Sequence, residues 1–176
     1  VKPGNANSYC DCDDGDGYGA GISGAESPDW CDGFDNNCNG QIDEGCAGAA
    51  CGQTLAGGAT LTGDLQCDMP GGQAALVVAA DNVLLDCDGF SITNSNAGKG
   101  MGILVKGDGV TVTGCVVGGF DHGIYLYGSS NSTVEESIAV DNSLYGIRVH
   151  SPGADKPSAN DVIINCEAAG NGKGIY

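Results

Sequence analysis

The most regular feature of the chain is an alternation of hydrophobic and polar residues that recurs after residue 50. Four segments begin with Gly-Ile and then alternate, at spacings of 21, 23 and 28 residues: 102–105, 123–126, 146–149 and 174–176. Successive side chains of a strand point to opposite faces, so each segment predicts a short strand with its Ile facing a core. A period in the range of roughly 20–50 residues is typical of a solenoid with one coil per repeat.

A second set of short alternating segments has the same order along the chain: 83–85, 111–113, 133–135 and 162–164. Each follows a turn of small polar residues, and no amphipathic helix separates the strands. Parallel strands without crossover helices must coil, which predicts an all-β fold, a parallel β-helix over residues 51–176 with about four complete coils. The last Gly-Ile segment stops at Tyr176, so we expect an open C-terminal end that is a template for another copy of the chain.

Residues 1–50 have a different composition and form a predicted second part, an irregular acidic segment held by disulfides and metal. The chain has 23 acidic and 6 basic residues, a net charge of −17, and ten of the acids lie in residues 1–46 opposed by Lys2 alone. Such a charge disfavours nucleic acid as a partner, because phosphate binding needs Lys and Arg. Ten cysteines in so short a chain indicate an extracellular or cell-surface protein, with a cytosolic metal protein carrying free thiols as the alternative. No signal peptide or membrane-spanning stretch is visible, and the first four residues look like a mature N-terminus.

The acidic segment contains a pattern of oxygen-bearing residues that is typical of a calcium loop. Counting from Asp35, positions 1, 3, 5 and 9 carry side-chain oxygens, Gly40 stands at position 6, and Gln41 offers its carbonyl at position 7. The usual Glu at position 12 is replaced by Cys46, so another acid must supply that ligand. The predicted ligands of this site are Asp35, Asn37, Asn39, Gln41 and Asp43, with Glu44 or Asp32 in addition.

Residues 29–46 as a whole resemble a metal-binding repeat of bacterial surface proteins and the calcium repeats of thrombospondins. Residues 14–19 resemble the partner half of that repeat, which implies a second Ca²⁺ site with Asp14, Asp16 and Tyr18. An Asp that the repeat has two residues earlier is Cys12 here, so this second site is less well defined. The alternatives are a solvated acidic tail without metal and a copper site, although hard oxygen ligands favour calcium.

The segments 51–55, 65–67 and 81–86 resemble the start of right-handed parallel β-helix domains of secreted, carbohydrate-associated, pectate-lyase-like proteins. The resemblance implies a right-handed coil and a disulfide between Cys51 and Cys67. The repeat pattern places Cys87, Cys115, Ser137 and Cys166 in one column, which we interpret as small side chains packing inward, with a Cys87–Cys115 disulfide as the alternative. The five cysteines of the acidic segment are an odd number and include a free thiol, a link to the β-helix or a bond between subunits: Cys10, Cys12, Cys31, Cys38 and Cys46.

The residues that alternate with the inward Ile and Val form an aromatic and cationic stripe on the outside of the coil. One column holds Leu104, Tyr125, Arg148 and Tyr176, and the next holds Lys106, Tyr127 and His150. The stripe has no carboxylate, which argues against a glycosidase or lyase site. The stripe allows two interpretations: it binds acidic sugars, or it is covered by the acidic segment or by another subunit. The positive charge of the stripe complements the acidic segment and slightly favours the second interpretation.

Two hypotheses of function follow. The first is a secreted, calcium-stabilised structural subunit that associates head to tail into a filament or surface layer. The second is a carbohydrate-binding or polysaccharide-processing module of a larger protein. His122 is expected to be structural, and Asn131 begins a glycosylation sequon on a predicted turn.

Overall fold

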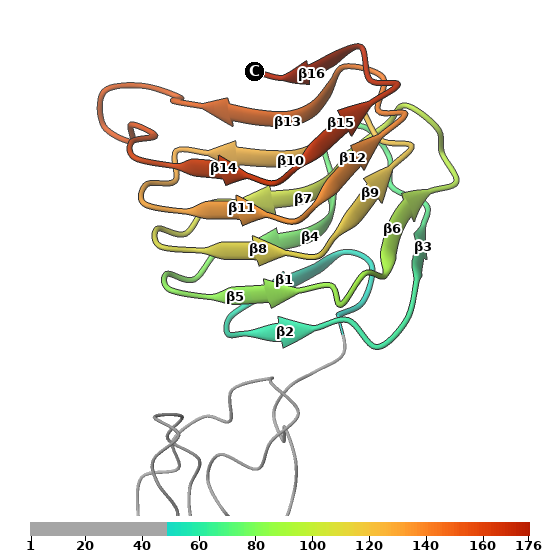
Figure 1. Ribbon diagram of the computed structural model, residues 1–176, viewed down its shortest axis with the longest axis horizontal. Helices are drawn as coiled ribbons and strands as arrows, with labels where there is room; N and C mark the ends of the chain where they lie inside the picture. Colours follow the sequence, from blue (N-terminus) through green and yellow to red (C-terminus); the bar gives the residue numbers. More distant parts are fainter. Residues whose placement is uncertain (1–48) are drawn as a thin grey trace, which may run out of the picture. The chain divides into compact units, whose positions relative to one another are not determined.

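The fold was analysed in a computed structural model, which describes residues 49–176. They form an all-strand parallel β-solenoid of about five coils, and no helix occurs among them (Figure 1). Every pairing between its named strands is parallel. The predicted fold class is therefore confirmed. The acidic segment lies almost entirely outside the described residues, so its predicted domain boundary, calcium ligands and five cysteines stay predictions.

Each complete coil contributes one strand to each of three sheets. Sheet A consists of β1 (Gln53–Leu55), β4 (Ala74–Val78), β7 (Met101–Val105), β10 (His122–Tyr127), β13 (Tyr145–His150) and β16 (Lys173–Ile175). Sheet B consists of β2 (Ala59–Thr60), β5 (Leu84–Asp86), β8 (Thr111–Thr113), β11 (Thr133–Glu135) and β14 (Val162–Ile164). Sheet C consists of β3 (Leu65–Cys67), β6 (Ser91–Asn94), β9 (Val116–Gly118), β12 (Ile138–Val140) and β15 (Glu167–Ala169).

The Gly-Ile repeats stack in register on sheet A, as the sequence predicts. Ile103, Ile124, Ile147 and Ile175 are register partners in succession, and the first three are fully buried. The preceding glycine is needed because neighbouring coils approach closely there. A Cβ on Gly123 would lie 2.6 Å from the carbonyl oxygen of Gly146, and one on Gly102 would lie 2.6 Å from that of Gly123.

Three details differ from the prediction. Sheet C was not expected, because strands such as β15, with the sequence Glu-Ala-Ala, carry no strong alternation of hydrophobic and polar residues. The first coil, β1 to β3, lacks the Gly-Ile signature and raises the expected four coils to about five. In sheet B, Leu85 rather than Leu84 pairs with Val112, so this strand lies one residue later than the repeat pattern predicts.

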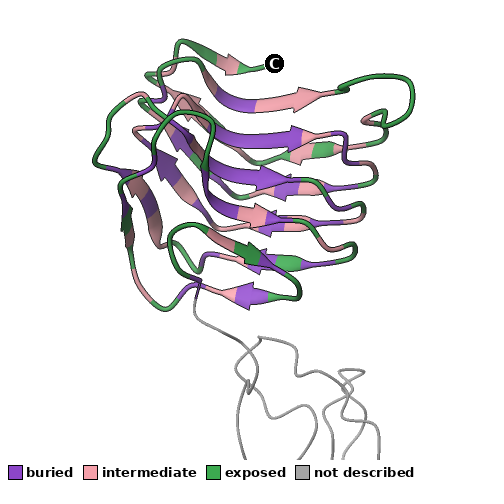
Figure 2. Ribbon diagram, turned by 180° about the vertical axis from the view of Figure 1, so that it is seen from behind, coloured by how far each residue is buried: buried purple, intermediate pink, exposed green. Residues whose placement is uncertain are grey.

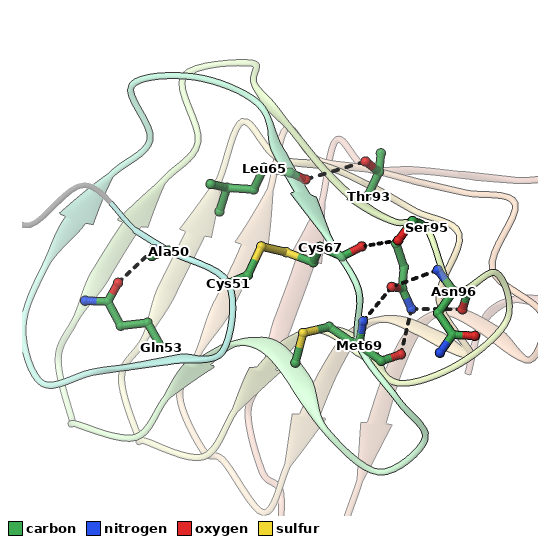
Figure 3. Close-up of a disulfide and its surroundings, with 10 residues drawn as sticks. Ala50, Cys51, Gln53, Leu65, Cys67, Met69, Thr93, Ser95 and Asn96 are labelled. Carbon is green, nitrogen blue, oxygen red and sulfur yellow. Dashed lines mark hydrogen bonds between the residues drawn. A yellow bond between two sulfur atoms is a disulfide. The ribbon is translucent and has the colours of Figure 1, made fainter.

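Two disulfides stabilise the lower coils, one within the first coil and one between the second and third. The expected bond between Cys51 and Cys67 is present and joins a residue two positions before β1 to the end of β3 (Figure 3). Cys87 and Cys115 are also bonded, so the interpretation of the whole column as unbonded small side chains is wrong. These two cysteines follow β5 and β8 at the bend between sheets B and C, where their Cα atoms are only 4.8 Å apart, within bonding range. Ser137 and Cys166 continue the column, and Cys166 is a free thiol.

Candidate ligand-binding face of sheet A

The outer face of sheet A changes character from the lower to the upper coils. On the lower coils Ala74 and Leu104, together with Tyr125 above them, form a small apolar cluster of their own, in which Leu104 and Tyr125 are each only 8% exposed. Figure 2 looks onto this sheet and shows largely buried middle strands, whereas the second half of β13 is of intermediate exposure. The predicted column of Leu104, Tyr125 and Arg148 is confirmed by the register of the strands.

Arg148 is the centre of the upper part of this face. Its guanidinium carbon lies 5.0 Å from the ring centroid of Tyr125 and 4.7 Å from that of Tyr145. Its Nη1 atom is 3.0 Å from Nε2 of His122, and its Nη2 atom is 3.5 Å from Nδ1 of His150. Its Nε is buried without a hydrogen-bond partner among the residues that the structure describes. The cation is therefore held by two tyrosine rings and two imidazoles.

A second cation lies one coil above. The ammonium group of Lys173 is 4.6 Å from the ring centroid of Tyr176 and 5.0 Å from that of Tyr145, whose hydroxyl it contacts at 3.4 Å. The rings of Tyr145 and Tyr176 are 5.2 Å apart, and Tyr176 is 65% exposed. Tyr127 stacks on His150 at 5.5 Å along the neighbouring column. We call the following residues the aromatic–cationic cluster: His122, Tyr125, Tyr127, Tyr145, Arg148, His150, Lys173 and Tyr176.

The cluster is positively charged in a chain dominated by acids. Residues 49–176 contain 13 acidic and 5 basic side chains (23 − 10 and 6 − 1). No Lys or Arg among them forms an ion pair with a carboxylate, and the one contact of this kind in the region joins His122 to Asp121, which is an ion pair only when the ring is protonated. The cations over sheet A thus lack carboxylate partners, although carboxylates are plentiful.

One carboxylate touches the cluster, through His122, which the predicted stripe did not include. Oδ1 of Asp121, in the turn before β10, is 2.9 Å from Nδ1 of His122.

A second electrostatic feature concerns Tyr125. Burial raises the pKa of its hydroxyl, while the charge of Arg148 opposes the rise. Tyr125 therefore stays neutral and contributes packing rather than charge.

The structure brings together most of the predicted stripe and adds residues that the alternation missed. His122 and Tyr125 are three residues apart, yet their rings stack at 4.8 Å, so strict alternation fails at Gly123. The same break places Tyr145 and Lys173 on the outside, in the column of His122. In the sequence, the residue directly before each Gly-Ile pair marks this outward column, and it could have been used to predict it. Lys106 does not join the cluster through any contact, and its carbonyl accepts a hydrogen bond from Nζ of Lys156 at 2.8 Å.

The remaining predicted position, Asn131, lies in an exposed turn with a left-handed backbone, and its Oδ1 accepts a bond from Nδ2 of Asn160 at 3.3 Å. Within residues 49–176 no group of three or more His, Cys, Asp and Glu side chains is arranged to hold a metal ion. The same part of the chain contains no helix with the length and hydropathy needed to cross a membrane.

The family model of the right-handed beta helix region matches residues 70–176, more than half of the chain. The chain belongs to this family. No curated protein and no solved structure matches the sequence significantly. The family establishes the right-handed coil and leaves function to be argued from the aromatic–cationic cluster, because one fold supports many activities.

Proposed function

We propose that this right-handed β-helix protein is an extracellular carbohydrate-binding module that holds acidic glycans on the outer face of sheet A. The observation that carries the proposal is Arg148, a cation packed among aromatic rings with no carboxylate partner within residues 49–176. Guanidinium groups bind carboxylate and sulfate through paired hydrogen bonds, and exposed aromatic rings pack on sugar rings. Tyr127 and Tyr176 supply accessible rings, whereas Tyr125 is too buried to receive a ligand.

A glycan array tests this function with single variants of the full chain. We expect the protein to retain sulfated or uronate-containing glycans and Arg148→Gln to weaken that binding about tenfold or more, the effect of losing a charged hydrogen bond of about 1.5–3 kcal/mol. The pair Tyr127→Ala and Tyr176→Ala should weaken it as well. Lys99→Gln, an exposed lysine outside the cluster, is the matched control. The absence of acidic glycans from the bound set, or equal losses in Arg148→Gln and Lys99→Gln, would contradict the proposal.

A second candidate function, head-to-tail association, is favoured by the uppermost coil. β14, β15 and β16 are edge strands of their sheets, and the core-facing Ile175 is 52% exposed. Exposed strand edges pair readily with other strands, and an end-to-end contact between unlike ends propagates into a filament. Sedimentation velocity and electron microscopy of concentrated protein test this. Filaments that disappear in Ile175→Glu support association, and dispersed monomers refute it.

A further inference from the structure

Asp121 and His122 form a chain of contacts that ends on the guanidinium of Arg148. Oδ1 of Asp121 is 2.9 Å from Nδ1 of His122, and Nε2 of the same ring is 3.0 Å from Nη1 of Arg148. The three side chains come from the turn before β10, the first residue of β10 and the middle of β13. The His122 side chain is only 12% exposed and that of Asp121 24%, so the contacts lie partly out of water.

The chemistry of the end groups decides which ring nitrogen of His122 carries the proton. A guanidinium group only donates hydrogen bonds, so Nε2 of His122 must accept one from Arg148. The proton of the neutral ring is then on Nδ1, which donates to the carboxylate of Asp121. Asp121 therefore holds the ring in the tautomer whose unprotonated nitrogen, Nε2, faces Arg148. This assignment follows from the donor and acceptor character of the partners and not from the distances alone.

We propose that Asp121 and His122 are positioning residues for Arg148. Asp121 orients the imidazole, and the imidazole fixes one N–H of the guanidinium while adding no positive charge of its own. The Nε–H of Arg148 is buried, so the N–H groups that could meet an anionic group of a ligand are those of the two terminal nitrogens, which are left with the weak contact to His150. This last step rests on the proposed glycan-binding function, whereas the tautomer and the orientation do not.

The contact with Arg148 fits only a ring that is unprotonated at Nε2. The titratable groups that face it are Asp121 and Tyr125 from its own strand region and Tyr145 and Arg148 from β13. On the other side its register partner is Met101 of β7, which carries no charge. A doubly protonated ring would direct an N–H and a positive charge at the N–H of Arg148, and the contact would be lost.

Nitrogen-15 NMR of the histidine rings in the full chain near neutral pH tests the positioning role. In the wild-type protein we expect His122 in the Nδ1–H tautomer. Asp121→Ala should shift it toward the Nε2–H tautomer, and Asp121→Asn, which keeps an acceptor oxygen, should largely preserve the original form. Asp68→Ala removes an exposed carboxylate elsewhere and should change nothing. An Nε2–H or doubly protonated His122 in the wild type overturns the inference, even if no variant folds.

Titration with inorganic sulfate, followed by the Arg148 Nε–H signal, separates this inference from the proposed function. We expect Asp121→Ala to weaken sulfate binding about fivefold or more, and Asp121→Asn and Asp68→Ala to change it by less than about twofold, since a misplaced charged donor loses about 1 kcal/mol. Equal affinities of wild type and Asp121→Ala overturn the positioning role. If the wild type has the expected tautomer but binds no sulfate, the positioning of Arg148 stands and the anion-binding function fails.

Discussion

At the scale of single residues, the bends of the coil are made by residues with a left-handed backbone. Within residues 49–176, seven non-glycine residues have positive φ, and six of them are Asn or Asp, which tolerate this conformation. Glu136, with φ of 48°, is the exception. Its register places it level with Gly114 below and Asn165 above, both also at positive φ. All three positions of this column therefore need a left-handed backbone, which Gly and Asn adopt at lower cost than Glu.

Replacing Glu136 with Asn should stabilise the protein. The left-handed region costs an ordinary residue roughly 1–2 kcal/mol, and Asn removes part of that cost, so we expect the free energy of unfolding to rise by about 0.5–1 kcal/mol. Urea denaturation measures the change. Glu167→Asn, at an exposed position within β15, is the control and should have little effect. Equal effects of the two substitutions would contradict the assignment of strain to Glu136.

A partly buried carboxylate in the uppermost coil, Asp161, makes stability depend on pH. Burial raises the pKa of Asp161, Asp108 adds to the rise, and the backbone N–H of Ser132, at 3.0 Å from Oδ1, opposes it. An acid whose pKa is higher in the folded than in the unfolded state stabilises the fold when protonated and destabilises it when ionised. Asp161 thus lowers stability above its folded pKa and ceases to do so as the pH falls toward the ordinary range of Asp, about 4.

We therefore expect Asp161→Asn, which keeps an oxygen for Ser132, to raise the melting temperature at neutral pH. The gain should shrink as the pH falls, because the wild-type carboxyl then becomes protonated. Thermal denaturation as a function of pH measures both effects, with the exposed Asp68→Asn as a control. A lower melting temperature of Asp161→Asn at neutral pH would contradict this, because it would show that the ionised carboxylate of Asp161 stabilises the fold.

At the scale of elements, strands of two to six residues are stable only because each is stacked between others. The Ile ladder of sheet A illustrates this: Ile124 has a partner above and below and is fully buried, whereas Ile175 on β16 has a partner only on β13. Stability in a solenoid is approximately the sum of contacts between neighbouring coils. The same substitution should therefore have very different effects in the middle and at the edge.

We expect Ile124→Ala to lower the free energy of unfolding by about 2–5 kcal/mol, because it removes buried methyl groups and leaves a cavity. Ile175→Ala should cost less than about 1 kcal/mol, since the side chain is 52% exposed. Urea denaturation of the two variants provides the comparison. Losses of similar size would mean that the edge of β16 is covered in solution, as head-to-tail association requires.

At the scale of the whole molecule, the charge is divided unevenly along the sequence. The acidic segment has ten acids against one base, and the β-helix has 13 against 5. Acids at this density repel one another unless cations bind between them. A Ca²⁺ ion bound in the loop predicted for residues 35–46 would reduce this repulsion between carboxylates.

Calorimetric titration of the full chain should detect one or two bound Ca²⁺ ions, and a chelator should lower the melting temperature, because an ion that binds only the folded form stabilises it. Replacing Asp35 and Asp43 by Asn together should remove the first site, whereas Asp68→Asn should not. Unchanged melting temperature and protease resistance after chelation would refute a working site.

The sequence by itself determined the architecture. Side-chain alternation and close coil approach act locally, so the Gly-Ile repeats sufficed to predict a parallel β-helix, the inward Ile ladder and the outward column of Leu104, Tyr125 and Arg148. The third sheet escaped because strands such as Glu167–Ala169 carry no strong alternation.

Only the tertiary structure decided which side chains meet. Strict alternation fails at Gly123, and this break places His122 beside Tyr125 and in reach of Arg148, 26 residues away. The contact of Asp121 with the cluster and the bonding of Cys87 to Cys115 likewise depend on the path of the chain at bends. A periodic pattern predicts the positions that repeat, whereas contacts at interruptions of the pattern are set by how successive coils stack.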